Sequence, residues 1–83
     1  MDKNDKTKLK VLIKMILINQ NHKCLTANQI CEIINTYEWG FRTSITSPKI
    51  SKILQYELKK SHINFMSDIK SRRGKNKILE YYI

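Results

Sequence analysis

Apolar residues recur with the spacing of an α-helix in three stretches of the chain, residues 7–20, 27–37 and 48–60. In the first stretch this spacing is kept by Leu9, Leu12, Ile13, Ile16 and Leu17. Residues 1–6 carry charges without the same periodicity. The pattern therefore predicts a flexible start over residues 1–6 and a single folded domain over residues 7–83 that begins with a helix.

Capping signals indicate where the second and third helices begin and end. Thr26 and Gln29 have the spacing of a capping box, in which each side chain bonds the backbone amide of the other residue. Gly40 follows the second helix, and glycine is a common helix stop. Ser47 and Pro48 begin the third helix, because serine is a favoured N-cap and proline loses nothing at the first helical position.

After the third helix the period of the pattern changes to the two-residue alternation of β-strands. Two strands are predicted in this way, the first from Ile63, Phe65 and Ile69 and the second from Leu79, Tyr81 and Ile83. Gly74, the only glycine of this region, lies in residues 71–76 and marks the tip of a hairpin. With a short strand near residues 23–25, the predicted fold class is α+β, a winged helix-turn-helix of three helices and a C-terminal β-hairpin wing.

The composition excludes several classes of function. With 83 residues the chain forms one small domain, which leaves no room for a sizeable catalytic cleft. Only two glycines are present, and the sequence shows no nucleophile–histidine–acid set, carboxylate pair or glycine-rich phosphate loop. The spacing of His22, Cys24 and Cys31 matches no common zinc site, and a buried free thiol is the expected state of Cys31. We therefore expect no enzyme activity, no cofactor and no metal.

The sequence also indicates a cellular location. Its longest apolar run, residues 11–18, is broken by Lys14 and is far shorter than the roughly 20 residues that span a bilayer. Its two cysteines are too few for the disulfide framework of a small secreted protein, and no signal-peptide pattern opens the chain. We expect an intracellular protein, nuclear if it is eukaryotic, that does not bind a membrane.

Positive charge is concentrated in the second half of the chain. The formal net charge is +9, and residues 40–83 hold ten Lys/Arg against three Asp/Glu, a net charge of +7. A charge of this sign and distribution indicates a polyanionic partner, and double-stranded DNA is the partner that we expect.

The third helix carries the first group of candidate DNA-binding residues. Its apolar residues fall on one face, so its polar residues face outward, and in a helix-turn-helix this outward face enters the major groove. Lys52, Gln55 and Tyr56 are expected near base edges, Ser51 at their flank, and Lys49 and Lys59 near phosphates. The alternative is a charged helix face that is merely solvated.

The hairpin tip carries the second group of candidates. Five cations crowd this short segment, namely Lys70, Arg72, Arg73, Lys75 and Lys77. Like charges so close repel one another, and an anionic partner relieves the repulsion. We expect them to contact phosphates, although an arginine at the tip can instead enter the minor groove. The alternatives are a hairpin kept soluble by its charge and a nuclear-localisation-like cluster.

Two further features leave other partners open. Val11, Met15 and Ile18 lie beside the main apolar face of the first helix. They form either a homodimer or partner-protein interface, or a surface that is covered by the wing strands or a neighbouring element. A weaker alternative is that Tyr56 and Trp39 stack on bases of RNA or single-stranded DNA, although Trp39 otherwise packs into the core.

The segments LTANQICEIINTYEWG (residues 25–40) and SPKISKILQYELKK (residues 47–60) resemble the eukaryotic winged-helix family that includes forkhead-like domains. The chain is most similar to the variants in fungal regulators and to the HARE-type helix-turn-helix, which share an LT-x-x-Q-I second helix, a polar connector, a third helix with lysine near its end, and a short wing. The resemblance covers roughly residues 7–83. The Asn-Ser-x-Arg-His signature of true forkheads is absent, so no base-reading residue can be assigned from it. The resemblance implies a three-helix winged domain in DNA-linked proteins.

Overall fold

The computed structural model describes five segments of the chain, residues 3–20, 23–36, 40–41, 44–59 and 66–83. Their elements are, in order, the helix α1 (Lys3–Asn19), the strand β1 (Leu25–Thr26), the helices α2 (Ala27–Asn35) and α3 (Ser47–Lys59), the strand β2 (Lys70–Arg73), the 3₁₀ turn η1 (Lys75–Lys77) and the strand β3 (Leu79–Tyr82). The described part of the chain is therefore an α+β fold of three α-helices and one antiparallel sheet. The predicted fold class is confirmed at this level.

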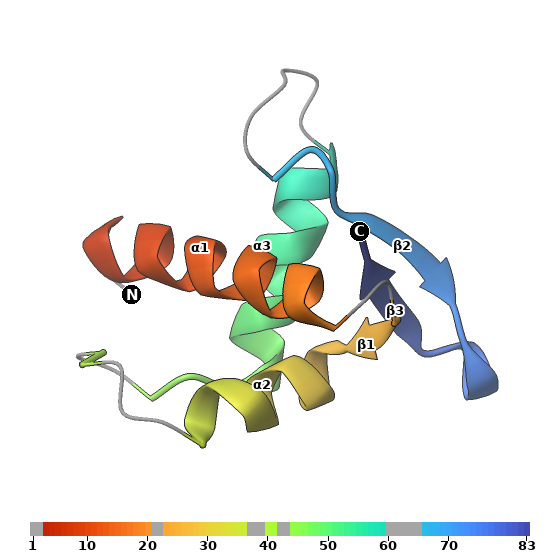
Figure 1. The fold of residues 1–83 in the computed structure, drawn as a ribbon, viewed down its shortest axis with the longest axis horizontal. Coiled ribbons are helices and arrows are strands. Elements are labelled where there is room, and N and C mark those ends of the chain that lie inside the picture. Colours follow the sequence, from red (N-terminus) through yellow and green to blue (C-terminus); the bar gives the residue numbers. More distant parts are fainter. Residues whose placement is uncertain (1–2, 21–22, 37–39, 42–43, 60–65) are drawn as a thin grey trace.

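The three strands form one sheet in the order β1–β3–β2, and both pairs of neighbours are antiparallel. Tyr81 of β3 stands opposite Leu25 of β1 on one side and opposite Ser71 of β2 on the other. Figure 1 shows the sheet beside the helices, with the β2–β3 hairpin extending away from them. Because β1 leads directly into α2, the sheet and the helices share one core.

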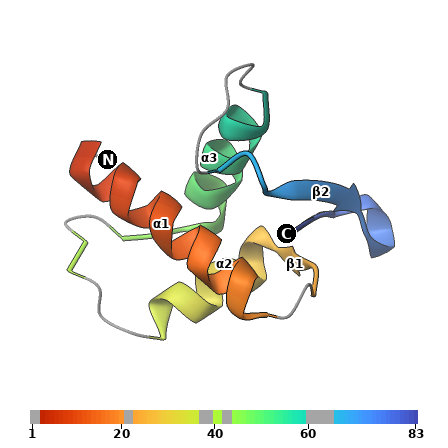
Figure 2. The same ribbon diagram turned by 45° about the horizontal axis from the view of Figure 1, so that its top comes forward.

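The core lies where the apolar faces of the three helices meet the sheet. Its buried side chains come from every element except β2 and η1, and include Leu9, Ile13, Leu17, Leu25, Ile30, Ile34, Ile50, Leu54 and Tyr81. Burial of each large apolar side chain stabilises the fold by on the order of 2 kcal/mol. This packing places α3 between α1 and the hairpin, as two views show (Figures 1 and 2).

The predicted starts of α2 and α3 are confirmed to within one residue. The backbone N–H of Thr26 donates to Oε1 of Gln29 at 2.9 Å, and the N–H of Gln29 donates to Oγ1 of Thr26 at 3.2 Å, which completes the capping box. The hydroxyl of Ser47 donates to Oδ1 of Asn28 and so joins the first turns of α2 and α3. Lys60, the predicted last residue of the third helix, lies outside the described residues.

α2 ends at Asn35, two residues earlier than predicted. The N–H and the hydroxyl of Thr36 both donate to the carbonyl of Glu32, at 3.1 and 2.8 Å. Gly40 has a left-handed φ of +75°, which glycine adopts without a steric cost. Residues 37–39 lie outside the described part of the chain.

α1 begins at Lys3, four residues earlier than predicted. Residues 3–6, which the sequence assigned to a flexible start, are helical, and residues 1–2 lie outside the described residues. Asp5 in the first turn is only 7% exposed, and its carboxylate lies at the end of the helix where the dipole favours negative charge. Neither α1, with 17 residues, nor any other described helix is long and apolar enough to cross a membrane.

The first strand of the hairpin lies further along the chain than predicted. β2 is Lys70–Arg73, where the sequence indicated the hairpin tip, and residues 66–68 form a turn. All four side chains of this edge strand are exposed, so no apolar alternation marks it in the sequence. Ile69 was predicted in the strand, but it packs in the core just before it. Residues 63 and 65, also predicted in this strand, lie outside the described residues.

The tip of the hairpin does not use its glycine for a left-handed turn. Gly74 has a φ of −91°, whereas Asn76 and Lys77 have left-handed φ values of 59° and 61°. The N–H of Gly74 donates to the carbonyl of Ile78 at 2.8 Å and closes the turn. A methyl group added at Gly74 would lie 2.5 Å from the carboxyl carbon of Glu80. The glycine therefore gives room to that carboxylate.

Candidate nucleic-acid interface

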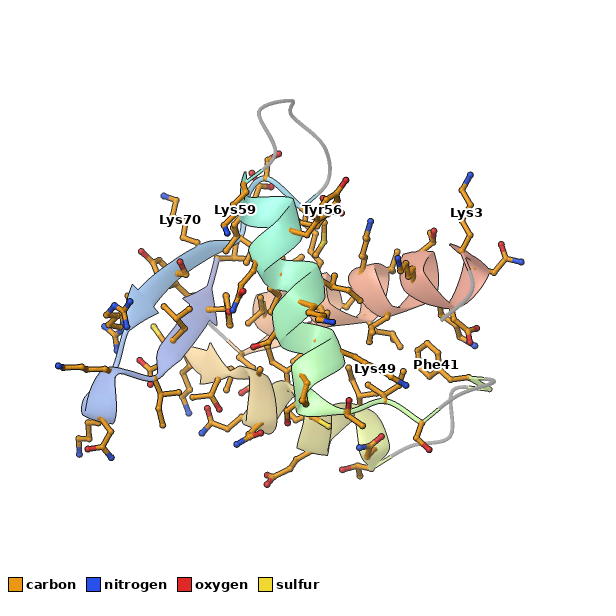
Figure 3. The ribbon with its side chains drawn as sticks, turned by 180° about the vertical axis from the view of Figure 1, so that it is seen from behind. Lys3, Phe41, Lys49, Tyr56, Lys59 and Lys70 are labelled. Carbon is orange, nitrogen blue, oxygen red and sulfur yellow. The ribbon has the colours of Figure 1, made fainter. Side chains whose placement is uncertain are left out.

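Three polar residues form a continuous stripe on the outer side of α3. Lys52, Gln55 and Lys59 are exposed, and their spacing of i, i+3 and i+7 places them above one another along the helix. The opposite side of the helix is buried through Ile50 and Leu54. Figure 3 shows α3 in front of the molecule, with the hairpin on one side and α1 on the other. We call these three residues the central stripe.

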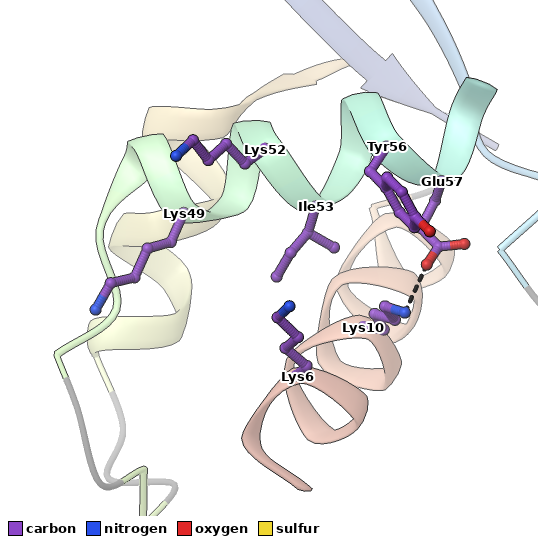
Figure 4. A pocket seen from close by; sticks show the side chains of 7 residues that line it. All are labelled: Lys6, Lys10, Lys49, Lys52, Ile53, Tyr56 and Glu57. Carbon is purple, nitrogen blue, oxygen red and sulfur yellow. Dashed lines mark ion pairs between the residues drawn. The ribbon is translucent and has the colours of Figure 1, made fainter. Parts of the chain in front are cut away.

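The other three candidate residues of α3 lie on its flanks. Ser51 is half-buried and lines a groove between α3 and the hairpin. Lys49 and Tyr56 line a cleft on the opposite flank, between α3 and α1 (Figure 4). The surface that the sequence predicted as one face is thus divided into three, because successive residues of a helix point about 100° apart.

The groove between α3 and the hairpin, which we call the hairpin groove, has a volume of about 540 Å³. Asn28 and Ser47, from the first turns of α2 and α3, line one wall, and Arg73 and Lys77 of the hairpin also line the groove. Helix N-termini carry partial positive charge because their first N–H groups have no partner within the helix. The groove therefore combines two such termini with two cations, and all of them favour an anion.

All five candidate cations of the hairpin are exposed. Two of them make contacts within the hairpin. The Nε of Arg72 donates to Oε1 of Glu80 at 3.1 Å, and this hydrogen bond raises the pKa of Arg72 above its usual value. The Nη1 of Arg73 donates to the carbonyl of Lys77 at 3.3 Å. The hairpin thus presents a cluster of positive charge, of which Arg72 alone faces an acid among the described residues.

The structure adds two lysines of α1 that the sequence analysis did not select. Lys6 and Lys10 lie one helical turn apart and line, together with α3, a cleft of about 540 Å³. Figure 4 shows them across this α1–α3 cleft from Lys49, Lys52 and Tyr56. The sequence assigned Lys6 to a flexible start, so it did not indicate that Lys6 and Lys10 share a face of the first helix. The helix begins at Lys3, and the i, i+4 spacing of the two lysines then places them on one face.

An ion pair with a buried carboxylate lies at the Tyr56 end of the α1–α3 cleft (Figure 4). The Nζ of Lys10 lies 2.5 Å from Oε1 of Glu57, whose side chain is 2% exposed. Glu57 is the only acidic residue of α3, so its burial leaves the exposed side of this helix without negative charge. Elsewhere along the cleft, the Nζ of Lys49 donates to the carbonyl of Ser44 at 2.6 Å.

The two cysteines carry thiols that could bind a metal. Cys24 and Cys31 are free thiols, and both are half-buried. The Sγ of Cys31 donates to the carbonyl of Ile45 at 3.6 Å, and its side chain packs against the core. Within the described ranges, no three His, Cys, Asp or Glu residues gather as a metal site would require. His22 lies outside these ranges.

Of the two aromatic side chains considered for base stacking, the structure describes one. Tyr56 is 65% exposed on the flank of α3. Trp39 lies outside the described residues. Phe41, two residues further on, packs against the core, and the Nζ of Lys8 lies 5.3 Å from the centre of its ring.

An apolar patch remains exposed on α1. Val11, Met15 and Ile18 are 42%, 52% and 54% exposed. Neither the hairpin strands nor any other element of the described chain covers them. The interpretation of this patch as a surface covered by the wing is therefore wrong for the described residues.

Comparison with known proteins finds no matching family model, no matching curated protein and no matching solved structure. The resemblance to winged-helix proteins therefore stays an interpretation of the sequence, and the function is inferred from the geometry and charge of the surface.

Proposed function

We propose that the protein is a winged-helix domain that binds double-stranded DNA, as part of a transcriptional regulator or a chromatin-linked protein. Helix α3 enters the major groove with its central stripe toward the bases, and the β2–β3 hairpin is a wing on the adjacent phosphate backbone. The order of the elements supports this proposal, because three helices are followed by a hairpin whose second strand pairs with the strand before α2.

The observation that carries the proposal is an exposed helix face without acid beside a basic hairpin. Glu57, the acidic residue of α3, is buried and forms an ion pair with Lys10. The hairpin groove then extends the positive surface from α3 to Arg73 and Lys77. A helix face that is only solvated usually mixes charges of both signs, whereas a continuous positive surface favours a polyanion.

The side chains of this surface have different roles in the proposal. Lys52 and Gln55 lie where base edges are read, since lysine donates to guanine and glutamine pairs with adenine. Lys59 and the hairpin cations lie toward the ends of the surface, where they neutralise phosphates. α3 contains no arginine for bidentate contact with guanine, so we expect modest sequence specificity.

Duplex binding measured over a salt series tests the proposal. If five or six phosphates are neutralised, the logarithm of the association constant falls with the logarithm of salt concentration with a slope of roughly −4 to −6. An affinity that stays flat between low and moderate salt contradicts the proposal. So does a preference for single-stranded DNA or RNA over a duplex of the same length.

A second candidate function, homodimerisation, rests on the exposed apolar patch of α1. Val11, Met15 and Ile18 follow the i, i+4, i+7 spacing with which the helices of two copies can interdigitate. The patch lies on the side of α1 opposite the core and not, as the sequence had indicated, beside the buried face, so a dimer leaves α3 and the hairpin open to DNA. Sedimentation tests this: we expect a dimer that Met15→Asp abolishes and Asn19→Asp retains. A monomer at high protein concentration contradicts it.

A further inference from the structure

The α1–α3 cleft has a composition that duplex binding alone does not explain. Four lysines surround it, Lys6, Lys10, Lys49 and Lys52. Its lining also includes the aliphatic side chain of Ile53 and the ring of Tyr56, which is 65% exposed (Figure 4). A phosphate of duplex DNA needs only the cations, whereas a base that has left its stack needs an apolar or aromatic surface as well.

We infer that this cleft binds one unpaired nucleotide, with its phosphate among the lysines and its base against Tyr56 and Ile53. The inference builds on the proposed duplex binding, because a strand that runs past the end of a bound duplex, or separates from it, reaches the cleft beside α3. The ligand is therefore a single-stranded extension of the same nucleic acid.

The charges of the cleft favour a phosphate. Four lysines and one carboxylate line it, a net charge of +3. The ammonium groups of Lys10 and Lys49 are already held, by Glu57 at 2.5 Å and by the carbonyl of Ser44 at 2.6 Å. Glu57 offsets the charge of Lys10, whereas Lys49, held by a neutral carbonyl, keeps its positive charge and needs no reordering when the ligand arrives. Lys6 and Lys52 form no ion pair within the described residues and complete the phosphate site.

The size and the lining of the cleft suit a base. A volume of about 540 Å³ lies in the range of small-molecule sites, which is about 300–1,000 Å³. Tyr56 lies beside the central stripe and not on it, so a base stacked on its ring does not compete with the major groove for Gln55 or Lys59, although Lys52 belongs to both the stripe and the cleft. Stacking of one base on an aromatic side chain strengthens binding by roughly 5- to 100-fold.

The experiment compares the affinities of four DNA probes: a blunt duplex, the same duplex with a short thymine extension at the 3′ end, the same with a 5′ extension, and the extension strand alone. One of the two extensions should tighten binding by roughly 5- to 100-fold relative to the blunt duplex. Tyr56→Ala should bring this ratio close to one, and Tyr56→Phe should keep it, because stacking needs the ring and not the hydroxyl. Thymidine monophosphate is added as a competitor. If it abolishes the gain from the extension, the cleft binds a free nucleotide; if it does not, the cleft needs a nucleotide that is attached to the bound strand.

Lys6→Gln should lower the ratio of the affinity for the extended duplex to that for the blunt duplex by roughly 2- to 4-fold at low salt, since one phosphate contact is lost. Lys23→Gln is the charge-matched control, because Lys23 is exposed and does not line the cleft, so it should leave the ratio unchanged. Circular dichroism confirms that each variant is folded.

Equal affinities for the blunt and both extended duplexes overturn the inference, as does a Tyr56→Ala variant that weakens blunt and extended duplexes by the same factor. Loss of blunt-duplex binding, with the extension strand still bound through Tyr56 and Lys6, would overturn the proposed duplex function and leave the cleft as a nucleotide site of a single-strand binder.

Discussion

Arg72 and Glu80 stand directly opposite each other on β2 and β3, and the Nε of Arg72 lies 3.1 Å from Oε1 of Glu80. This pair places a carboxylate inside the most basic part of the molecule. The carboxylate also lies against Gly74, where a methyl group would come within 2.5 Å of it. In the proposed DNA complex, Glu80 would therefore compete with a phosphate for Arg72.

Glu80→Gln should tighten duplex binding. The substitution removes the counter-charge of Arg72, so we expect an increase of roughly 2- to 5-fold at low salt and a salt slope steeper by about one. Fluorescence anisotropy over a salt series measures both. Glu32→Gln, at an exposed position of α2, changes the net charge equally and is the control. Equal effects of the two substitutions would show that only net charge matters.

Gly74→Ala should act in the same direction as Glu80→Gln. Its φ of −91° suits alanine, so the added methyl group displaces the flexible end of Glu80 rather than the backbone. Arg72 then loses its partner in the folded hairpin. Because both substitutions break the same pair, the double variant should bind DNA no more tightly than Glu80→Gln alone. Additive gains in a double-mutant cycle would contradict this coupling.

Lys10→Met should destabilise the fold by about 3 kcal/mol, because it removes the counter-charge 2.5 Å from the buried carboxylate of Glu57. Urea denaturation measures the free energy of unfolding. Lys14→Met is the matched control on the same helix: Lys14 pairs at 3.4 Å with Asp68, whose side chain is 73% exposed, so its loss should cost less than about 1 kcal/mol. Equal costs would mean that burial of Glu57 does not depend on Lys10.

Thr26→Ala should lower the free energy of unfolding by about 1 kcal/mol, because the N–H of Gln29 loses its capping oxygen. Thr7→Ala inside α1 is the control. The hydroxyl of Thr7 donates to the carbonyl of Lys3 within the helix, and alanine is the better helix former, so we expect little change or a small gain. Thermal or urea denaturation measures the stability of both variants, and a loss in Thr26→Ala alone identifies the helix cap as its cause.

Gln55→Ala and Lys75→Gln should weaken duplex binding in different ways. Gln55 lies on the central stripe, so its loss should cost more at a preferred sequence than at a random one and leave the salt slope unchanged. Lys75 lies at the hairpin tip, so its loss should weaken all duplexes alike and reduce the slope by about one. A selection experiment provides the preferred sequence. A reduced salt slope for Gln55→Ala and a sequence-dependent loss for Lys75→Gln would mean that the hairpin reads the bases and α3 contacts the phosphates.

Local order was predictable from the sequence because it depends on near neighbours. Thr26 and Gln29 are three residues apart, and their capping box places the start of α2 whatever packs around it. The helical spacing of Ile50 and Leu54 likewise identified the buried side of α3, and with it the exposed side that carries Lys52. The uneven distribution of charge was also a property of the sequence alone.

The sequence by itself thus determined the helices, their order and the sign of the surface charge. Tertiary structure decided which charges meet. Lys6 and Lys52 are far apart in the chain and share a cleft only because the apolar faces of α1 and α3 enter one core. β2 contains no apolar residue, so its strand conformation comes from pairing with β3, which also sets Glu80 against Arg72. Such contacts depend on the packing and pairing of distant segments, which a pattern read along one segment does not contain.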